Sequence, residues 1–454
     1  MSTDEELRAE ARLRLAAQLK ILTAQHPRRL EWYGGDALGN ETHDLADFRF
    51  LYDPTGFLVR VGSEGDVNEA LDKLFVVDDP PDPTSDPELM ALDLVRFPLP
   101  KARKDGNEPR VLDALDLIDA ELDIPDEIDQ NNEEHMRKFV AQPDHWLHMC
   151  PVGGGRICPA VEPEVTQATA PYPPQDNPSF GAGVTVSVVD TGWHPPAALD
   201  QDTPWLAGVD GDRENYNGEV VRKYAGHGTF VAGVVKCFAP AADVRVEGFL
   251  TKTGAIRESK MVKQLGQALA LHNPHIINLS AGSTTRKNRP LLSFERFFDK
   301  RLSPLDNACL LVAAAGNEGV VDDFWPASFD WALGVGSLDR DGEVSSFSNF
   351  GRSAEVYAVG HRIVNAFPTG RYTTREPPHP GQRRYFTTGL ARWSGTSFSA
   401  PMVAGLVAAE LGRRGDDDVM AAKDDVLAKT HDVPSPASVA GAAPIMVKAL
   451  QVPQ

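Results

Sequence analysis

The spacing of hydrophobic and polar positions divides the chain into two parts with different element patterns. In the first part, residues 5–24 repeat apolar positions at helical spacing and predict an amphipathic helix, through Leu7, Ala11, Leu15, Leu19 and Leu22. Apolar runs over 48–52 and 57–61 flank Asp53-Pro54-Thr55-Gly56. Because Pro and Gly favour turns, this pattern predicts a β-hairpin.

Three further elements complete the first part. A helix begins near Ser63, an alternating strand covers 92–97, and a second helix covers 111–120. These elements predict an α+β N-terminal domain over residues 1–142. A Pro-rich connector over 143–178 follows it.

The second part, residues 179–454, has the pattern of an α/β domain. Val184 to Val189 is a continuous run between glycines, which is typical of a strand buried on both faces of a mainly parallel sheet. Small apolar residues follow His227 and also Ser397. These runs predict two buried helices, each carrying a polar residue at its start.

Four short segments carry candidate chemistry. A serine hydroxyl is a weak nucleophile near neutral pH, so Ser397 in Ser-Gly-Thr-Ser needs a base, and His227 in Gly-His-Gly-Thr supplies an imidazole. Asp190 follows the buried strand, and a carboxylate there can orient and stabilise that imidazole. Asn317 in Ala-Gly-Asn can donate, with the N–H of Ser397, to a developing oxyanion.

The order of these segments selects among the known serine hydrolases. Asp, then His, then Ser is the order of subtilisin, whereas chymotrypsin and the α/β-hydrolases use other orders. With Asn317 between His227 and Ser397, the chain resembles the subtilisin-like serine peptidases (subtilases, peptidase family S8). The resemblance implies a serine endopeptidase of the subtilisin-like three-layer fold, with Asp190, His227 and Ser397 as its triad and Asn317 in its oxyanion hole.

The resemblance covers roughly residues 178–452 and extends beyond the catalytic segments. It implies two walls of a substrate pocket, listed here by residue: Ser280, Ala281 and Gly282 on one side, and Ala314, Ala315 and Gly316 on the other. It also implies a C-terminal helix over 445–450. Asp322 and Asp323 follow the second wall. They would favour basic residues before the cut if they reached the pocket, and would otherwise be a solvated turn.

Subtilases often carry an N-terminal pro-domain whose tail crosses the active site, and the candidate tail runs from residues 143–148 through the Pro-rich segment 159–178. Two alternatives follow for residues 1 to about 170: a folding helper and inhibitor that is removed, or a retained regulatory domain. A different class of function is a protease-derived binding or regulatory protein without turnover. Ser397 alone also fits a helix start, where a hydroxyl satisfies free backbone N–H groups.

Charge narrows the set of partners. The chain has 454 residues and a net charge of −20, and residues 1–170 hold 35 acidic and 17 basic side chains, which accounts for 18 of those charges. This acidity argues against nucleic acid and against anionic membranes. The expected partners are a protein or peptide substrate and the chain's own N-terminal domain. Neither a signal peptide nor a membrane span is recognised, so a cytoplasmic location is expected.

The cysteines and histidines give little sign of a cofactor. Cys237 and Cys309 lie in apolar runs and are expected to be core residues, while Cys150 and Cys158 are close enough in sequence to pair. A zinc site from His145, His148 and Cys150 is disfavoured. No cofactor or metal is therefore expected, although structural calcium stays open.

Overall fold

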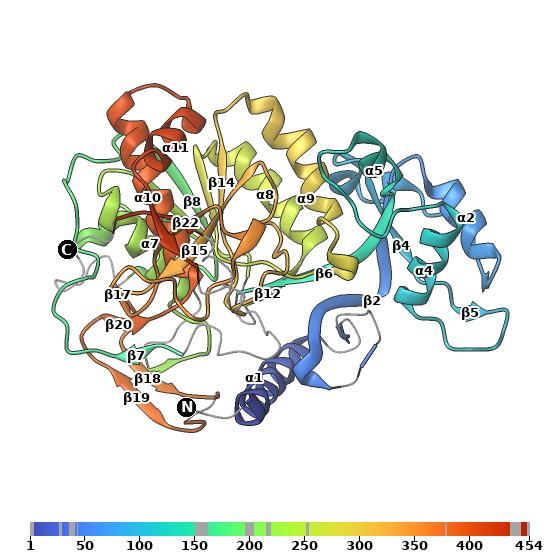
Figure 1. Ribbon diagram of the computed structural model, residues 1–454, viewed down its shortest axis with the longest axis horizontal. Coiled ribbons are helices and arrows are strands. Elements are labelled where there is room, and N and C mark those ends of the chain that lie inside the picture. Colours follow the sequence, from blue (N-terminus) through green and yellow to red (C-terminus); the bar gives the residue numbers. More distant parts are fainter. Residues whose placement is uncertain are drawn as a thin grey trace.

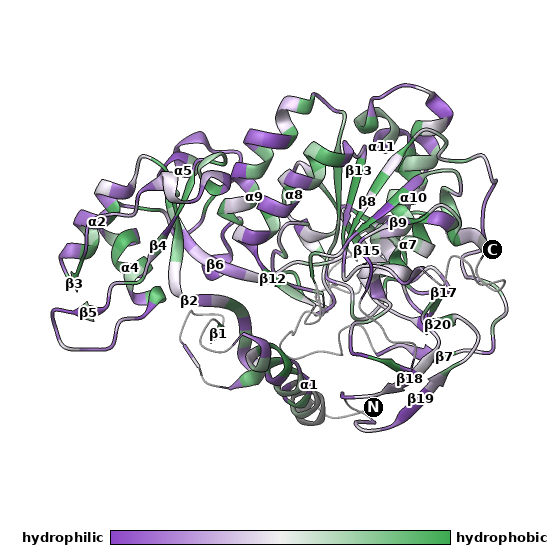
Figure 2. Cartoon of the chain, turned by 180° about the vertical axis from the view of Figure 1, so that it is seen from behind, coloured by the Kyte–Doolittle hydropathy of each residue, from purple (hydrophilic) through white to green (hydrophobic). Residues whose placement is uncertain are grey.

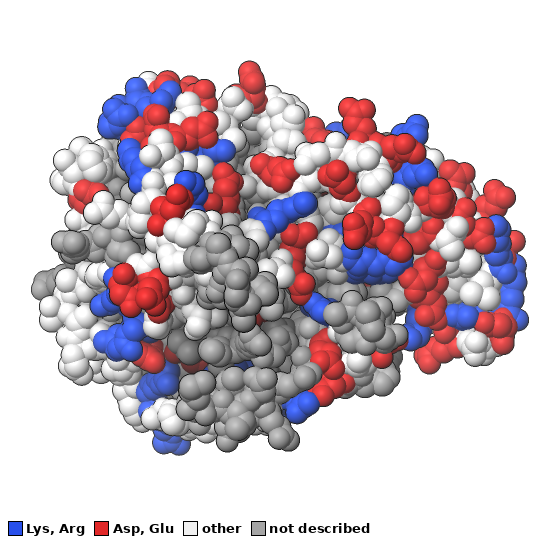
Figure 3. All heavy atoms as spheres, viewed as in Figure 1, with Lys and Arg blue, Asp and Glu red and all other residues white. Residues whose placement is uncertain are grey.

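The computed structural model describes residues 4–26, 30–35, 41–42, 44–149, 162–195, 204–214, 219–250, 254–376, 379–435 and 446–451. Within them lie a small N-terminal domain and a larger domain built on a central sheet (Figure 1). Asp and Glu side chains are dense over the small domain in the view of Figure 3, as the charge distribution predicts.

The small domain is an antiparallel sheet with helices packed against it. Its elements are α1 (Asp4–Gln25), β1 (Glu31–Gly34), β2 (Phe48–Arg60), α2 (Glu64–Asp72), β3 (Phe75–Val76), α3 (Pro87–Met90), β4 (Leu94–Pro98), β5 (Ala102–Arg103), α4 (Val111–Glu121), α5 (Glu133–Lys138) and β6 (Ala141–His148). The sheet order is β1-β2-β6-β12, with β4 also on β2, and β12 (Ala255–Arg257) comes from the larger domain. β6 therefore joins the two domains.

The predicted hairpin over 48–61 is wrong, because β2 continues through it as one long strand. Asp53 accepts hydrogen bonds from the backbone N–H and the hydroxyl of Thr55, and the pairing of β2 with β6 changes register between Tyr52 and Phe57. The turn-forming residues thus make an irregularity within the strand rather than a reversal. The predicted boundary at 142/143 falls inside β6.

Among the residues that the structure describes, the central sheet of the larger domain has nine strands. Their order is β21 (His431–Pro434), β22 (Met446–Ala449), β16 (Val356–Val359), β15 (Ala332–Leu338), β14 (Leu310–Ala314), β13 (Ile276–Leu279), β8 (Thr185–Val189), β11 (Asp243–Glu247) and β9 (Asp210–Gly211). All neighbours are parallel except β21 and β22. The predicted mainly parallel sheet is confirmed.

Helices cover both faces of this sheet (Figure 1). One layer holds α7 (His227–Phe238), α10 (Thr396–Arg414) and α11 (Val419–Leu427), and the other holds α8 (Glu258–His272) and α9 (Leu292–Phe297). Alternate residues of β8 face the two layers, so Val188 packs toward α7 and α10 while Val189 packs toward α8. Figure 2 shows green, hydrophobic residues within the central strands, and β8 and β13 are buried almost throughout, as strands covered on both faces must be.

Smaller strands complete the larger domain. They are β7 (Glu164–Val165), β10 (Val220–Val221), β17 (Ile363–Ala366), β18 (Gly370–Thr373), β19 (Arg383–Phe386) and β20 (Leu390–Trp393). The predicted C-terminal helix over 445–450 is wrong, because Met446–Ala449 forms β22. This strand pairs along its length with β21, and Ala449 pairs with Tyr357 of β16, so sheet pairing outweighs any local helical preference.

Candidate active site

Asp190 lies at the carboxyl end of β8, where an open parallel sheet places polar side chains outside its core. The residue is fully buried, and its backbone N–H donates to the carbonyl of Glu247 at the end of β11. The N–H of Thr191 donates to Asp190 Oδ1 over 2.8 Å. These bonds hold the carboxylate in one orientation.

His227 is the first residue of α7 and faces this carboxylate. Its Nδ1 lies 2.8 Å from Asp190 Oδ2 and 2.9 Å from Oδ1, so Nδ1 carries the proton and Nε2 is left as the basic nitrogen. The helix can begin here because Gly226 adopts φ +84°, which other residues rarely do. A Cβ on Gly228 would collide with the carbonyl of Gly192, so α7 is packed tightly onto the Asp190 loop.

Ser397 is the second residue of α10, and this helix meets α7 at its start. The ring of Phe398 lies 5.3 Å from the His227 ring, and Trp393 contacts the same imidazole edge-on at 5.2 Å. Ser280 Oγ donates to the Ser397 carbonyl over 3.1 Å. The neighbour of Ser397, Phe398, therefore lies beside the histidine, and Ser397 itself is at a helix N-terminus, where the dipole favours negative charge.

Asn317 is tied to the residue before Ser397. Its Oδ1 accepts from the Thr396 N–H over 2.8 Å and from the Thr396 hydroxyl over 3.0 Å. Two donors on one atom identify it as the amide oxygen, so Nδ2 is available to donate elsewhere. Asn317 is buried, and a donor held in a buried, fixed position is suited to stabilising an oxyanion.

The predicted pocket walls are buried beside this cluster, and one of them is paired with the small domain. The residues are Ser280, Ala281, Gly282, Ala314, Ala315 and Gly316. His148 of β6 donates its N–H to the Gly282 carbonyl over 3.0 Å and accepts from the Gly282 N–H over 3.3 Å. On its other side β6 pairs antiparallel with β12. The first part of the predicted tail is therefore an inserted strand between two edges of the larger domain.

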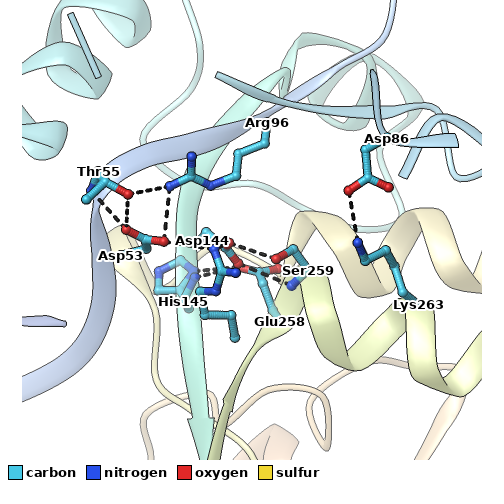
Figure 4. A network of polar contacts seen from close by, with 10 residues as sticks. Asp53, Thr55, Asp86, Arg96, Asp144, His145, Glu258, Ser259 and Lys263 are labelled. Carbon is cyan, nitrogen blue, oxygen red and sulfur yellow. Dashed lines mark hydrogen bonds and ion pairs between the residues drawn. The ribbon is translucent and has the colours of Figure 1, made fainter. Parts of the chain in front are cut away.

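Buried polar contacts fix this strand at the start of α8 (Figure 4). His145 Nδ1 lies 2.9 Å from Glu258 Oε1, and Ser259 donates its hydroxyl to Asp144 over 2.7 Å. Burial raises the pKa of Asp144 to about 6, although Arg257 beside it acts in the opposite direction. His145 is thus used in a hydrogen-bonded network, and the sequence had offered no signal for Glu258.

A second buried cluster joins α4 to the larger domain. Asp119 lies 2.9 Å from Arg286, 3.0 Å from Lys287 and 2.9 Å from Arg289. Asp119 and Arg289 are almost completely buried. The small domain also shares a continuous apolar core with α8 and α9.

Helix α1 covers the outer side of the inserted strand. Leu15 and Leu22 pack with Trp146 of β6 and Ala255 of β12, and the His26 ring lies 4.6 Å from the Trp146 ring. The predicted helix over 5–24 is confirmed, but its position could not be foreseen. It adds a second layer over the edge where β6 is held.

Glu214 is a half-buried carboxyl near Asp190 that sequence reasoning missed. The Gly226 N–H donates to Glu214 Oε2 over 2.7 Å, so the group supports the turn that leads into His227. Burial raises its pKa to about 8, and the nearby Asp190 charge acts in the same direction. A lone Glu in a loop has no sequence signal that could reveal this.

Asp322 and Asp323 are each held by another side chain. Asp322 forms an ion pair with Arg49 of β2, and Asp323 accepts from Asn288 over 3.1 Å. Glu318, next to Asn317, is the buried carboxyl close to the pocket, and burial raises its pKa to about 8. Asn349 donates to Glu318 Oε2 over 2.6 Å.

Within the described ranges, no group of three or more His, Cys, Asp or Glu side chains could hold a metal ion. The expectations about cofactors and calcium stay predictions. Cys150 and Cys158 lie outside the described residues, while Cys237 and Cys309 are free thiols. None of the helices in the described part of the chain is long and apolar enough to span a bilayer.

Comparisons with known proteins connect this geometry with one family. The family model described as the subtilase family, Peptidase S8, matches residues 181–424. The thermostable alkaline protease of Halalkalibacterium halodurans is 29% identical over 241 residues, covering 50% of this chain and 57% of that protein. The intracellular serine protease of Paenibacillus polymyxa is 28% identical over 265 residues, covering 54% of this chain and 70% of that protein.

One solved structure, that of the prenylagaramide maturation protease PagA, is 26% identical to this chain. The alignment has a TM-score of 0.43 and covers 55% of this chain and 84% of that chain. The chain thus matches a little over half the length of the alkaline protease and more of the other two.

Proposed function

The chain belongs to the subtilase family, and from this premise we propose that it is a serine endopeptidase acting through Asp190, His227 and Ser397. The observation that carries the proposal is the contact of His227 Nδ1 with both oxygens of Asp190, at 2.8 and 2.9 Å. That contact leaves Nε2 free to take the proton of Ser397 Oγ. The two helices that carry these residues meet at their N-termini.

The reaction follows from these roles. Ser397 Oγ attacks the peptide carbonyl as its proton passes to His227 Nε2, and Asp190 stabilises the resulting imidazolium. Asn317 Nδ2 and the Ser397 N–H donate to the carbonyl oxygen as it becomes negative. Each such donor contributes about 2.7–4 kcal/mol. His227 then protonates the leaving amine, and water hydrolyses the acyl-enzyme by the same steps in reverse.

The N-terminal region acts as a built-in inhibitor in this proposal. β6 takes up the backbone pairing of Gly282 and of β12, so a substrate strand cannot use the same donors and acceptors. The proposed division is a control domain over 1–142, a connector over 143–178 and a peptidase domain over 179–454. The shared core with α8 and α9 favours a domain that stays bound over one that is removed and lost. The cytoplasmic location expected from the sequence stays a prediction.

Labelling with a small fluorophosphonate tests the catalytic assignment. The full chain is compared with Ser397→Ala and with Ser399→Ala, a matched change of a buried hydroxyl two residues further along α10. The proposal expects labelling of the wild type and of Ser399→Ala only. Labelling of Ser397→Ala, or a wild type that never reacts, would instead support a binding protein without turnover.

Mass spectrometry of the same samples tests the control domain. If the chain processes itself, the wild type is shorter than Ser397→Ala and its new N-terminus lies before residue 179. If the domain is retained, the two chains have equal length. The retained inhibitor is supported if the wild type and Ser397→Ala have equal length and the wild type is labelled slowly. Labelling should then become faster in variants that weaken the binding of β6.

A further inference from the structure

The space between the two pocket walls is filled by the ring of Phe324. A Cβ on Gly282, in the first wall, would lie 2.9 Å from Phe324 Cδ1. A Cβ on Gly316, in the facing wall, would lie 3.1 Å from Phe324 Cγ. Real Cβ atoms hardly ever approach so closely, so the ring touches the backbone of both walls. Phe324 is 2% exposed, which leaves little open space around it.

The backbone of Phe324 is held firmly in this position. Its N–H donates to Ser328 Oγ over 3.0 Å and to Ser353 Oγ over 2.8 Å. The next residue, Trp325, exchanges two backbone hydrogen bonds of 2.9 Å with Ser283. Moving the ring out of the gap by shifting this segment would break several buried hydrogen bonds at once.

Three carboxyl groups lie close to the ring in sequence or in space, and each has a partner in the described part of the chain. Asp322 is paired with Arg49, and Asp323 accepts from Asn288. Glu318 Oε2 would lie 2.6 Å from the same Cβ on Gly316, and it accepts a hydrogen bond from Asn349. A side chain entering between the walls would therefore meet the aromatic ring together with a carboxyl group that already has a partner.

We propose that Phe324 determines specificity by restricting the residue before the cut to small side chains such as Gly, Ala and Ser. The inference rests on the proposed function, since it assumes that Ser397 is acylated by peptides lying along Ser280 to Gly282. Close packing explains the restriction: with the ring in place, a Leu or Phe side chain would overlap its atoms.

Peptidyl phosphonate aryl esters test this inference in the full chain, because an active serine attacks the phosphorus, displaces the aryloxide and becomes phosphonylated. Two probes are identical except for the residue before the reactive group, which is Ala in one and Phe in the other. Their second-order labelling rate constants are compared. The ratio of the two rates cancels the fraction of molecules in which β6 has left the cleft. We expect the Ala probe to react at least about 10-fold faster with the wild type, the lower end of what pocket size achieves.

Phe324→Ala should reverse this ratio, because removal of the ring opens the gap. Phe329→Ala is the matched control, since Phe329 is an equally buried aromatic residue that contacts Trp325 instead of the two glycines. Phe324→Leu gives an intermediate change if Phe324→Ala does not fold. A wild type that accepts both probes equally, or a ratio unchanged in both Phe324 variants, would overturn the inference.

The fluorophosphonate separates this failure from failure of the proposed function. It carries no side chain for the gap, so it should label the wild type and Phe324→Ala at similar rates. Normal labelling with no preference between the peptidyl probes refutes the role of Phe324 alone. Absence of all labelling refutes the peptidase proposal, and the specificity inference with it.

Discussion

Replacing Asp119 with Asn removes one carboxylate on which three cations of the peptidase domain converge. Its side chain contacts Arg286, Lys287 and Arg289, all at 2.9–3.0 Å. Each of these contacts crosses from α4 to the other domain. The substitution therefore weakens the hold of the control domain directly, at a nearly isosteric position.

The size of the effect depends on which ion pairs and hydrogen bonds the three cations retain in Asp119→Asn. Removing one partner of a buried ion pair costs about 3–5 kcal/mol, because a buried charge is left uncompensated. Arg286 retains Asp116, Lys287 retains Asp126, and Arg289 retains the Pro125 and Asp126 carbonyls. We therefore take the lower end, about 3 kcal/mol. This free energy corresponds to a roughly 100-fold increase in the fraction of molecules with an open cleft.

The assay is the fluorophosphonate labelling rate of the full chain, which rises with the open fraction. Asp119→Asn should react roughly 100-fold faster than the wild type if opening limits access. Asp123→Asn is the control, because Asp123 is exposed and pairs with Lys138 of its own domain. An exposed pair contributes at most about 1 kcal/mol, and here it does not cross the interface.

Two results would refute this reasoning. Asp119→Asn could label at the wild-type rate with an unchanged melting temperature, which would mean that the cluster does not hold the domains together. Alternatively, Asp123→Asn could accelerate labelling as much as Asp119→Asn. The effect would then come from general loosening of the small domain and not from the interface.

Three further predictions concern other parts of the mechanism. Folding raises the pKa of Glu214 from 4.5 to about 8 and so favours its neutral form. The free energy of unfolding should therefore fall by up to about 5 kcal/mol as the pH rises from 4.5 to 8. Urea unfolding at pH 5 and pH 9 should show this fall for the wild type and a smaller fall for Glu214→Gln. Gly228→Ala should lower kcat about 100-fold by displacing His227, whereas Gly266→Ala, which has room in α8, should leave kcat unchanged. Leu15→Ala should cost about 2–5 kcal/mol where α1 packs on Trp146 and should accelerate labelling, while the exposed Leu13→Ala should do neither.

The strand and the two helices that carry the proposed triad could be predicted because their signals are local. The run from Val184 to Val189 between glycines is typical of a buried strand, and the small residues after His227 and Ser397 suit buried helices. The order of Asp190, His227, Asn317 and Ser397 supplied the rest, since it separates unrelated serine hydrolases.

The errors arose where distant pairing decides a local conformation. Asp53-Pro54-Thr55-Gly56 has the chemistry of a turn, yet partners on both sides of β2 keep it extended. Met446–Ala449 is too short for periodicity to distinguish a strand from a helix, and β21 and β16 decide it. Glu214 and Phe324 gave no signal at all, because each acts through contacts with residues far away in the sequence.

In these proposals β6 blocks the cleft and Phe324 sets specificity, and both contact the wall at Gly282 but through different atoms. β6 occupies the backbone donor and acceptor of Gly282, whereas Phe324 packs against the Cα of the same residue. His148 contributes only an edge contact to the Phe324 ring, at 6.5 Å. Release of β6 and choice of substrate should therefore vary independently. Asp119→Asn should change the absolute labelling rates but not the ratio of the two peptidyl probes, and Phe324→Ala should change the ratio but not the fluorophosphonate rate.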